Sequence, residues 1–301
     1  MMHNNLTALS PAETGLSITG KRFRPGDLVL HALIYISAGI TVLILAAIII
    51  YVVVRGAPQI TWQFLSTAPS ALKQRYGILP SIINTLYIVV ITLIISTPIG
   101  VGAAVYLNEY AKRGRLIRLI EFTIETLAGI PSIIYGLFGA IFFGTYLKLG
   151  YSILTGALTL TIMVLPIIIR TTQEALKTVP QSYREGALGM GAGKWHMIRT
   201  IILPSSMSGI ITSIILSIGR IVGESAALLY TAGSVTNLPT NWITHATSSG
   251  ATLTVQMYFA VSNGKYSNEG FGIALVLILI VFIINSLTKI IAKRSAKSKG
   301  G

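Results

Sequence analysis

The sequence predicts an all-α polytopic membrane protein with six transmembrane helices. Hydrophobic residues make up 52% of its 301 residues and charged residues only 11%, whereas soluble domains carry about 25% charged residues. The mean hydropathy is +0.73, and the apolar residues lie in long uncharged runs. Six of these runs approach the roughly 20 residues that a helix needs to cross a bilayer. Such a composition excludes an ordinary soluble enzyme and a disordered chain.

The first run, residues 30–54, contains no Asp, Glu, Lys or Arg. It is longer than the roughly 7–15-residue apolar core of a signal peptide, and no small-residue cleavage pattern follows it. We therefore expect an uncleaved first transmembrane helix. A polar, basic cytoplasmic tail over residues 1–28 precedes it.

Five further apolar runs are expected to span the membrane, namely 83–107, 126–147, 151–169, 208–230 and 271–291. Pro98, Pro131 and Pro166 lie inside three of them. Proline interrupts a helix in water, but neighbouring helices in a membrane bundle satisfy the freed backbone groups, so we expect kinks. The runs define a transmembrane domain over residues 29–292, followed by a basic cytoplasmic tail over 293–301.

The distribution of lysine and arginine predicts the orientation. With the N-terminus inside, 17 of the 23 basic residues fall in cytoplasmic segments and five in external ones, which is the positive-inside pattern. Both termini are then cytoplasmic. The connection 170–207 is a cytoplasmic loop and 231–270 an external loop. Basic cytoplasmic loops beside membrane lipid explain the formal charge of +14. We therefore expect no nucleic acid partner.

Several kinds of chemistry are excluded or disfavoured by the sequence. There is no cysteine, which excludes thiol catalysis and disulfides. The segment from Gly15 to Lys21 partly matches the glycine-rich phosphate-binding loop of nucleotide-binding proteins. In that loop a Ser or Thr that binds magnesium follows the lysine, whereas here Arg22 follows it. We therefore expect no ATPase site, no cofactor and no enzymatic activity in this chain. No metal site is expected, because four histidines lie without metal-ligand spacing: His3, His31, His196 and His245.

The loop 170–207 carries a spaced pattern. Ser182 with Glu185 three residues later predicts a helix start with a capping box, and Gly191 suits a helix end with positive φ. A surface-lying amphipathic connector explains a helix here, but it requires no particular spacing. The full pattern comprises Glu185, Gly186, Ala187, Gly191, Ile201, Leu203 and Pro204.

This pattern resembles the cytoplasmic loop of ABC importer permeases, whose middle position is usually Ala where Gly186 stands here. The resemblance implies that the loop forms coupling helices which dock in a cleft of an ATPase subunit. Four further segments resemble one group within this family, the phosphate importer permeases of the PstA type. They are Asn84-Thr-Leu, 98–110, 129–136 and 219–226. In that family Pro normally follows the last segment, and here Ala227 stands there.

The resemblance implies a permease subunit that forms half of the translocation path of an ATP-driven phosphate importer. The implied partners are a homologous second permease, two ATP-binding subunits that hold ATP and Mg, and an extracytoplasmic phosphate-binding protein. The inner or plasma membrane is the implied location. Three alternatives remain: a permease for molybdate or sulfate, a proton-coupled secondary anion transporter, and a non-transporting membrane sensor subunit.

Charged residues inside a span indicate a pathway. Arg220 lies near the middle of run 208–230, with Glu224 at i+4. Such charges face protein or water. The planar guanidinium of arginine suits a tetrahedral oxyanion such as phosphate. Glu224 could then accept a hydrogen bond from the P–OH group of the phosphate. The alternative is a self-neutralising pair. Asn84, Ser132 and Tyr135 are further pathway candidates, although each also suits a helix–helix hydrogen bond.

Overall fold

The described part of the chain consists of helices and the segments that connect them. A computed structural model describes residues 25–70, 75–112, 114–239, 241, 244–262, 264 and 266–297. The chain divides into two compact units, residues 1–50 and 51–301. In the first unit the described residues belong to α1 (Pro25–Gly56), whose apolar stretch is long enough to cross a membrane.

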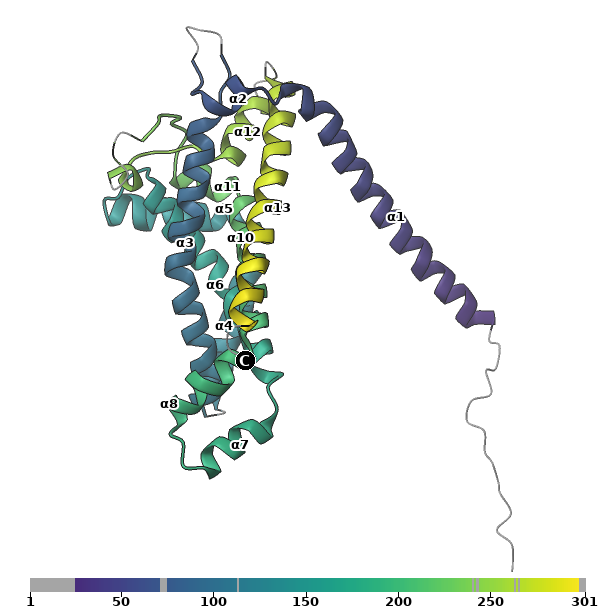
Figure 1. Ribbon diagram of the computed structural model, residues 1–301. Helices are drawn as coiled ribbons and strands as arrows, with labels where there is room; N and C mark the ends of the chain where they lie inside the picture. The colour runs from purple at the N-terminus through teal and green to yellow at the C-terminus, as the bar shows by residue number, and fades with distance from the viewer. Residues whose placement is uncertain are drawn as a thin grey trace, which may run out of the picture. The chain divides into compact units, whose positions relative to one another are not determined.

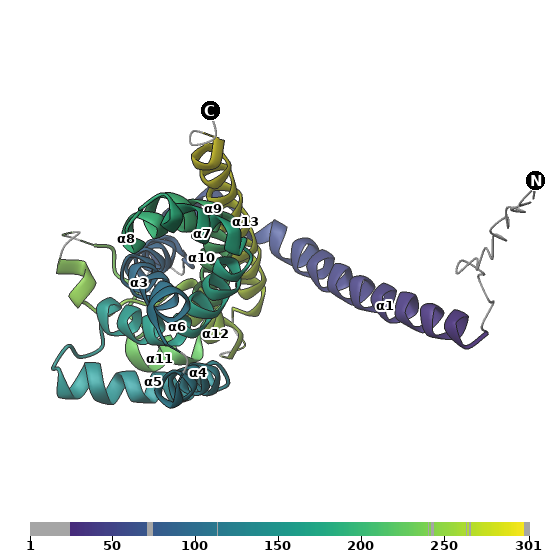
Figure 2. The same cartoon turned by 90° about the horizontal axis from the view of Figure 1, so that it is seen from below.

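The second unit is a helical bundle. Its helical segments are η1 (Ala57–Gln59), α2 (Trp62–Ser66), α3 (Leu79–Val105), η2 (Tyr106–Tyr110), α4 (Arg115–Ala128), α5 (Ser132–Gly139), η3 (Ala140–Tyr146), α6 (Ile153–Lys177), α7 (Gln181–Gly189), α8 (Lys194–Met197), η4 (Ile198–Ile202), α9 (Leu203–Ser205), α10 (Met207–Val222), α11 (Ala226–Thr231), η5 (Thr244–Thr247), α12 (Leu253–Ser262) and α13 (Ser267–Lys297). In Figure 1, α3 and α13 run the length of the bundle, and α7 lies at the end opposite α12. Figure 2 views the same bundle from the α7 end.

The predicted spans correspond to four unbroken helices and two bent pairs. The unbroken spans are Val29–Gln59, Leu79–Tyr110, Ile153–Lys177 and Ser267–Ile290, and they match four of the predicted runs. Pro98 and Pro166 lie inside α3 and α6, each of which continues through its proline as one helix. The bent pairs are Arg115–Ala128 with Ser132–Tyr146 and Lys194–Ser205 with Met207–Val222, and the span count is six if each pair is one span.

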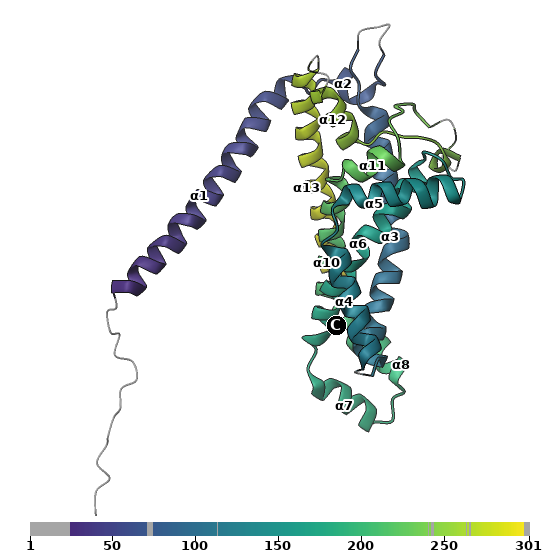
Figure 3. The same cartoon turned by 180° about the vertical axis from the view of Figure 1, so that it is seen from behind.

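The single kinked helix predicted over 126–147 is wrong. α4 and the α5–η3 helix meet at 101°, a corner visible in Figure 3. Pro131 lacks an N–H and restricts Ile130 before it, and Gly129 adds backbone freedom, so the helix ends here instead of bending. The Tyr135 hydroxyl donates to the Leu127 carbonyl at 2.7 Å and fastens the corner.

The uninterrupted span predicted over 208–230 is also wrong. α10 ends at Val222 and α11 begins at Ala226. Glu224 lies in the break, and its carboxylate accepts the backbone N–H of Ala227 at 3.1 Å. That contact satisfies one of the donors that the start of a helix leaves open.

Much of the predicted external connection 231–270 folds back into the bundle. Leu253 and Val255 of α12 are fully buried. The N–H of Leu253 donates to the Thr85 hydroxyl of α3 at 3.0 Å, and the Gln256 amide donates to the Gly77 carbonyl at 3.0 Å. Polar side chains of α3 and α12 therefore satisfy backbone groups that would be costly to bury unpaired.

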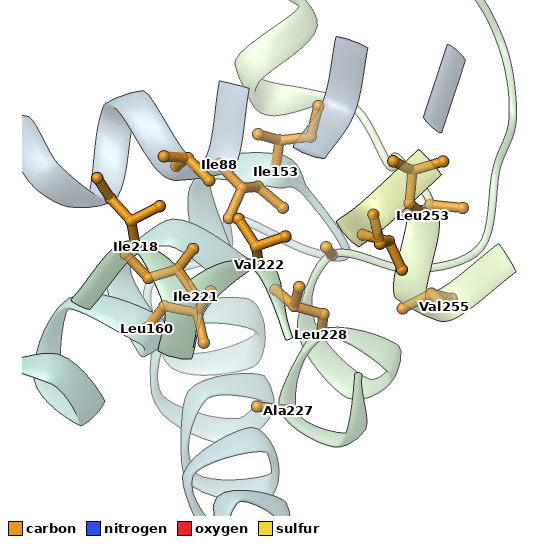
Figure 4. Packing of buried hydrophobic residues seen from close by; sticks show 14 of the residues in the cluster. Ile88, Ile153, Leu160, Ile218, Ile221, Val222, Ala227, Leu228, Leu253 and Val255 are labelled. Atoms are coloured by element: carbon orange, nitrogen blue, oxygen red, sulfur yellow. The ribbon is translucent and has the colours of Figure 1, made fainter. Parts of the chain in front are cut away.

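The main core lies where α3, α6, α10, α11 and α12 meet. Figure 4 shows Ile88, Leu160, Ile221, Leu228 and Leu253 from these five helices packed together. At its edge α5 crosses α11 closely, since a Cβ on Gly136 would lie 2.8 Å from the Cα of Ala227. Glycine is therefore required at position 136 for this crossing.

Candidate coupling and transport sites

The pattern residues of the loop 170–207 divide between surface and interior. Glu185 and Gly186 are exposed on α7. Ala187 is 2% exposed and packs in a second apolar cluster with Leu176 and Met197. Ile201, Leu203 and Pro204 are half-buried at the far end of the loop. Ala187 therefore holds α7 against its own chain, and it is Glu185 and Gly186 that face outward.

Gly191 ends α7 as the sequence predicts. Its φ is +85°, its N–H donates to the Leu188 carbonyl at 3.0 Å, and the N–H of Ala192 donates to the Ala187 carbonyl at 3.0 Å. These two bonds form a Schellman motif, which favours glycine at the left-handed position. The helix end sets the direction in which the chain returns to α8.

The predicted capping box at Ser182 is wrong. α7 begins at Gln181 with Pro180 in the N-cap position, and no side chain caps it. Ser182 consequently lies inside the first turn, two positions past the N-cap position from which a side chain caps the helix.

Sequence reasoning missed an apolar surface on α7 and α8. We call it the α7 surface, and it consists of Tyr183, Leu188, Met190 and Trp195, all at least half exposed, with Met190 at 83%. Large apolar side chains left exposed along one short segment suit a contact with another macromolecule. Their spacing follows no simple period, because the loop turns between them, and so no helical pattern singled them out.

The intrahelical Arg220–Glu224 pair, which was the alternative to a pathway role, does not form. Ion pairs in the part of the chain that the structure describes join Arg170 to Glu125, Lys177 to Glu174 and Arg184 to Glu109. The α10 helix ends between Arg220 and Glu224, so they no longer occupy successive turns of one helix.

Glu224 is buried and committed to the fold. Besides its carboxylate contact to α11, its backbone carbonyl accepts from the Thr254 hydroxyl of α12 at 2.6 Å. Arg220 is exposed on this chain, and its Nη2 lies 4.0 Å from the Sδ of Met163. An exposed guanidinium on an apolar helix remains available to a ligand or a partner subunit.

The other three pathway candidates differ in burial. Asn84 is fully buried; its amide donates to the Ala251 carbonyl at 3.0 Å, and its Oδ1 lies 2.7 Å from the Nε2 of His245. Tyr135 is buried at the α4–α5 corner, while Ser132 is half-buried at the start of α5. Asn84 and Tyr135 make the helix-fastening bonds that were the alternative to a pathway role. Within the described ranges, no group of three His, Asp or Glu side chains is placed to hold a metal ion.

Comparison with known proteins identifies the family. Residues 96–299 match the family described as "binding-protein-dependent transport system inner membrane component". The chain belongs to this family. The permease is 31% identical to the phosphate transport system permease protein PstA of Haemophilus influenzae over 256 residues, which cover 85% of this chain and 90% of that protein. It is 40% identical to the probable ABC transporter permease protein YqgI of Bacillus subtilis over 202 residues, 66% and 69% of the two chains.

Solved structures agree on the fold of this permease. A chain of the bacterial alginate ABC transporter in complex with its pentasaccharide-bound periplasmic protein aligns with a TM-score of 0.66 at 16% identity, over 91% of this chain and 96% of that one. The fold of an ABC transporter membrane subunit, predicted from the sequence, is thereby confirmed. At this identity the likeness concerns the fold alone.

Proposed function

We propose that this chain is the permease subunit of an ATP-driven importer of inorganic phosphate and forms half of its translocation path. The observation that carries the proposal is the similarity to PstA, which extends over 85% of this chain and 90% of that relative. A homologous second permease supplies the other half. An extracytoplasmic phosphate-binding protein delivers the substrate.

The α7 surface supports coupling to one of the two proposed ATP-binding subunits. Tyr183, Leu188 and Met190 form an exposed apolar set, and Glu185 on the same short helix adds a charge that orients the contact. A helix of this kind binds by laying its side chains in a groove of the partner. ATP and Mg bind in that partner, and this chain transmits the movement without hydrolysing ATP.

Arg220 supports an anionic substrate. A charge on an apolar membrane helix is costly unless it faces protein or water, and none of the described ion pairs involves Arg220. Its planar guanidinium donates two parallel hydrogen bonds to a phosphate. We assign the phosphate contact to Arg220 and a structural role to Glu224.

The proposed location is the cytoplasmic (inner) membrane, with both termini and α7 in the cytoplasm. The lysine and arginine distribution supports this orientation. It places the α7 surface on the side where ATP is available.

Uptake by the purified complex in sealed liposomes tests the function. With binding protein outside and ATP inside, we expect accumulation of radiolabelled phosphate that persists when the proton gradient is collapsed and that excess molybdate or sulfate does not inhibit. A non-hydrolysable ATP analogue is the control and should abolish uptake.

Each alternative gives a different result. Preferential uptake of molybdate or sulfate would assign another oxyanion. Loss of uptake on collapse of the proton gradient, with ATP present, would indicate a secondary transporter. An assembled complex that binds ATP but moves none of the three anions would indicate a sensor.

A further inference from the structure

A buried ion pair joins α7 to the C-terminal end of α3. Arg184 Nη2 lies 2.9 Å from Glu109 Oε1, and Arg184 Nε lies 3.4 Å from Oε2. The two side chains are only 13% and 5% exposed. In the other two described ion pairs, both side chains are more than half exposed. Burying two charges is costly unless their hydrogen bonds are satisfied, so the remaining partners matter.

Those partners come from a third segment. Arg184 Nη1 donates to the Val179 carbonyl at 2.6 Å, and Nη2 donates to the Leu176 carbonyl at 2.9 Å. These carbonyls lie at the C-terminal end of α6, where helix carbonyls lack intrahelical partners and favour a cation. Asn108 donates to Glu109 Oε1 at 2.7 Å. One guanidinium thus ties α7 to α6 and to η2.

Arg184 and Ala187 are the main attachments of α7. All the remaining residues of Gln181–Gly189 are exposed. The Ala187 methyl group makes only a non-directional apolar contact, whereas a bidentate guanidinium–carboxylate contact fixes both distance and direction. The orientation of α7 relative to α3 therefore depends on Arg184.

One half of the attachment lies in a π-helical turn. Glu109 is in η2, which ends α3, and η4 follows α8 on the other arm of the loop. From that arm, Lys194 Nζ lies 4.9 Å from the ring centroid of Tyr110, also in η2. π-helical turns are rare and occur frequently at functional sites. Both arms of the loop thus converge on η2.

We propose that the Arg184–Glu109 pair transmits displacement of α7 to the transmembrane helix α3, and that both residues are positioning residues for coupling. The inference rests on the proposed function of α7 as the docking helix. When a closing ATPase moves α7, an apolar contact alone lets the helix pivot about Ala187. The ion pair instead forces η2, and α3 with it, to follow.

The test compares Glu109→Gln, Arg184→Gln and the double variant in the reconstituted complex. Phosphate transported per ATP hydrolysed is measured alongside ATPase association. Each single variant should bind the ATPase and hydrolyse ATP, while transport per ATP falls by at least about fivefold, the lower end of typical coupling free energies. The double variant should lose no more than the singles, because the pair acts as one unit.

Glu174→Gln is the matched control. It breaks an ion pair of the same charges, Lys177–Glu174, that is exposed at the same end of the bundle, and it should leave transport per ATP unchanged. If Glu109→Gln does not assemble, Arg184→Lys replaces it: lysine keeps the charge but cannot make the two-point contact with Glu109 that fixes distance and direction, so transport per ATP should again fall.

Normal transport per ATP in an assembled variant would overturn the proposal. So would additive losses in the double variant, or a loss of ATPase association that accounts for all lost transport. If phosphate is not the substrate, the wild type itself transports none. Hydrogen exchange of α7 amides in the ATPase-bound complex then still tests the pair, because protection should fall in Glu109→Gln and not in Glu174→Gln.

Discussion

Arg220 decides whether the substrate side of the proposal is correct. Arg220→Lys keeps the positive charge but loses the planar fork. We expect phosphate uptake to fall about tenfold or more, since a hydrogen bond to a charged group contributes about 1.5–3 kcal/mol. Arg170→Lys is the matched control, because Arg170 is an exposed arginine already paired with Glu125. Uptake by both variants is measured after assembly with the ATPase has been verified.

Glu224→Gln separates the two intramembrane residues. Glutamine retains an oxygen that can accept the Ala227 N–H, so α11 should stay capped and uptake should remain near the wild-type value. If its loss of uptake equals that of Arg220→Lys, Glu224 belongs to the pathway after all. Wild-type uptake by Arg220→Lys would remove Arg220 from it.

His245 predicts a pH-dependent attachment of the segment before α12. Burial lowers the pKa of His245 below its ordinary value of 6.5, so the docked segment binds a proton less readily than the undocked one. Docking is then fully stable above about pH 6.5 and weakens as the pH falls from there through the lowered pKa. Its ring contacts Asn84 and Ser248, and Tyr87 packs edge-on against it.

Amide hydrogen exchange over residues 244–253 measures this effect. Corrected for intrinsic rates, protection should be lower at pH 5.5 than at pH 8 in the wild type. His245→Gln keeps a donor for Asn84 but does not titrate in this range, so its protection should not change with pH. An equal change in both proteins would assign the pH dependence to another group.

At the scale of elements, the end of α7 gives the sharpest prediction. Gly191→Val places a β-branched residue at φ +85°, which costs about 1–3 kcal/mol and opens the Schellman bonds. We expect loss of ATPase association and of uptake, with normal membrane insertion. Gly186→Ala is the control: position 186 has open space and ordinary helical φ, so alanine should be tolerated. Normal association of Gly191→Val would make the loop a mere connector.

Prolines show why elements were only partly predictable. Pro98, Pro131 and Pro166 sit in equally apolar runs, yet two lie inside continuous helices and one marks a 101° corner. Gly129 beside Pro131 is a local indication that the helix ends there. Whether a proline bends a helix or ends it also depends on long-range contacts such as the close crossing of Gly136 and Ala227. The break at Glu224 likewise depends on Thr254, thirty residues away.

Coupling residues show the same division. Gly191 was predictable because a helix end with positive φ leaves a local signal. Arg184 and Glu109 were not, because 75 residues separate them and each alone resembles an ordinary boundary charge. The α7 surface was not predictable either, because the loop changes direction between its residues and their spacing has no helical period. Composition predicted the membrane fold well, since every span must be apolar regardless of its neighbours.

At the scale of the whole molecule, the orientation remains a prediction that one labelling experiment tests. The chain contains no cysteine, so single cysteines can be introduced without background. Ser182 on α7 and Ser234 after α11 are both exposed. In sealed cells, an impermeant maleimide should label Ser234→Cys, while Ser182→Cys should react only after permeabilisation.

The charge distribution is the reason for this expectation. Moving the basic loops across the membrane would place 17 of the 23 lysines and arginines outside, against the bias that sets topology. Labelling of Ser182→Cys from outside would put α7 and its apolar surface on the side without ATP. The docking of α7 and the coupling role of Arg184 and Glu109 would then fall together, whereas the fold and the buried contacts of Glu224 would stand.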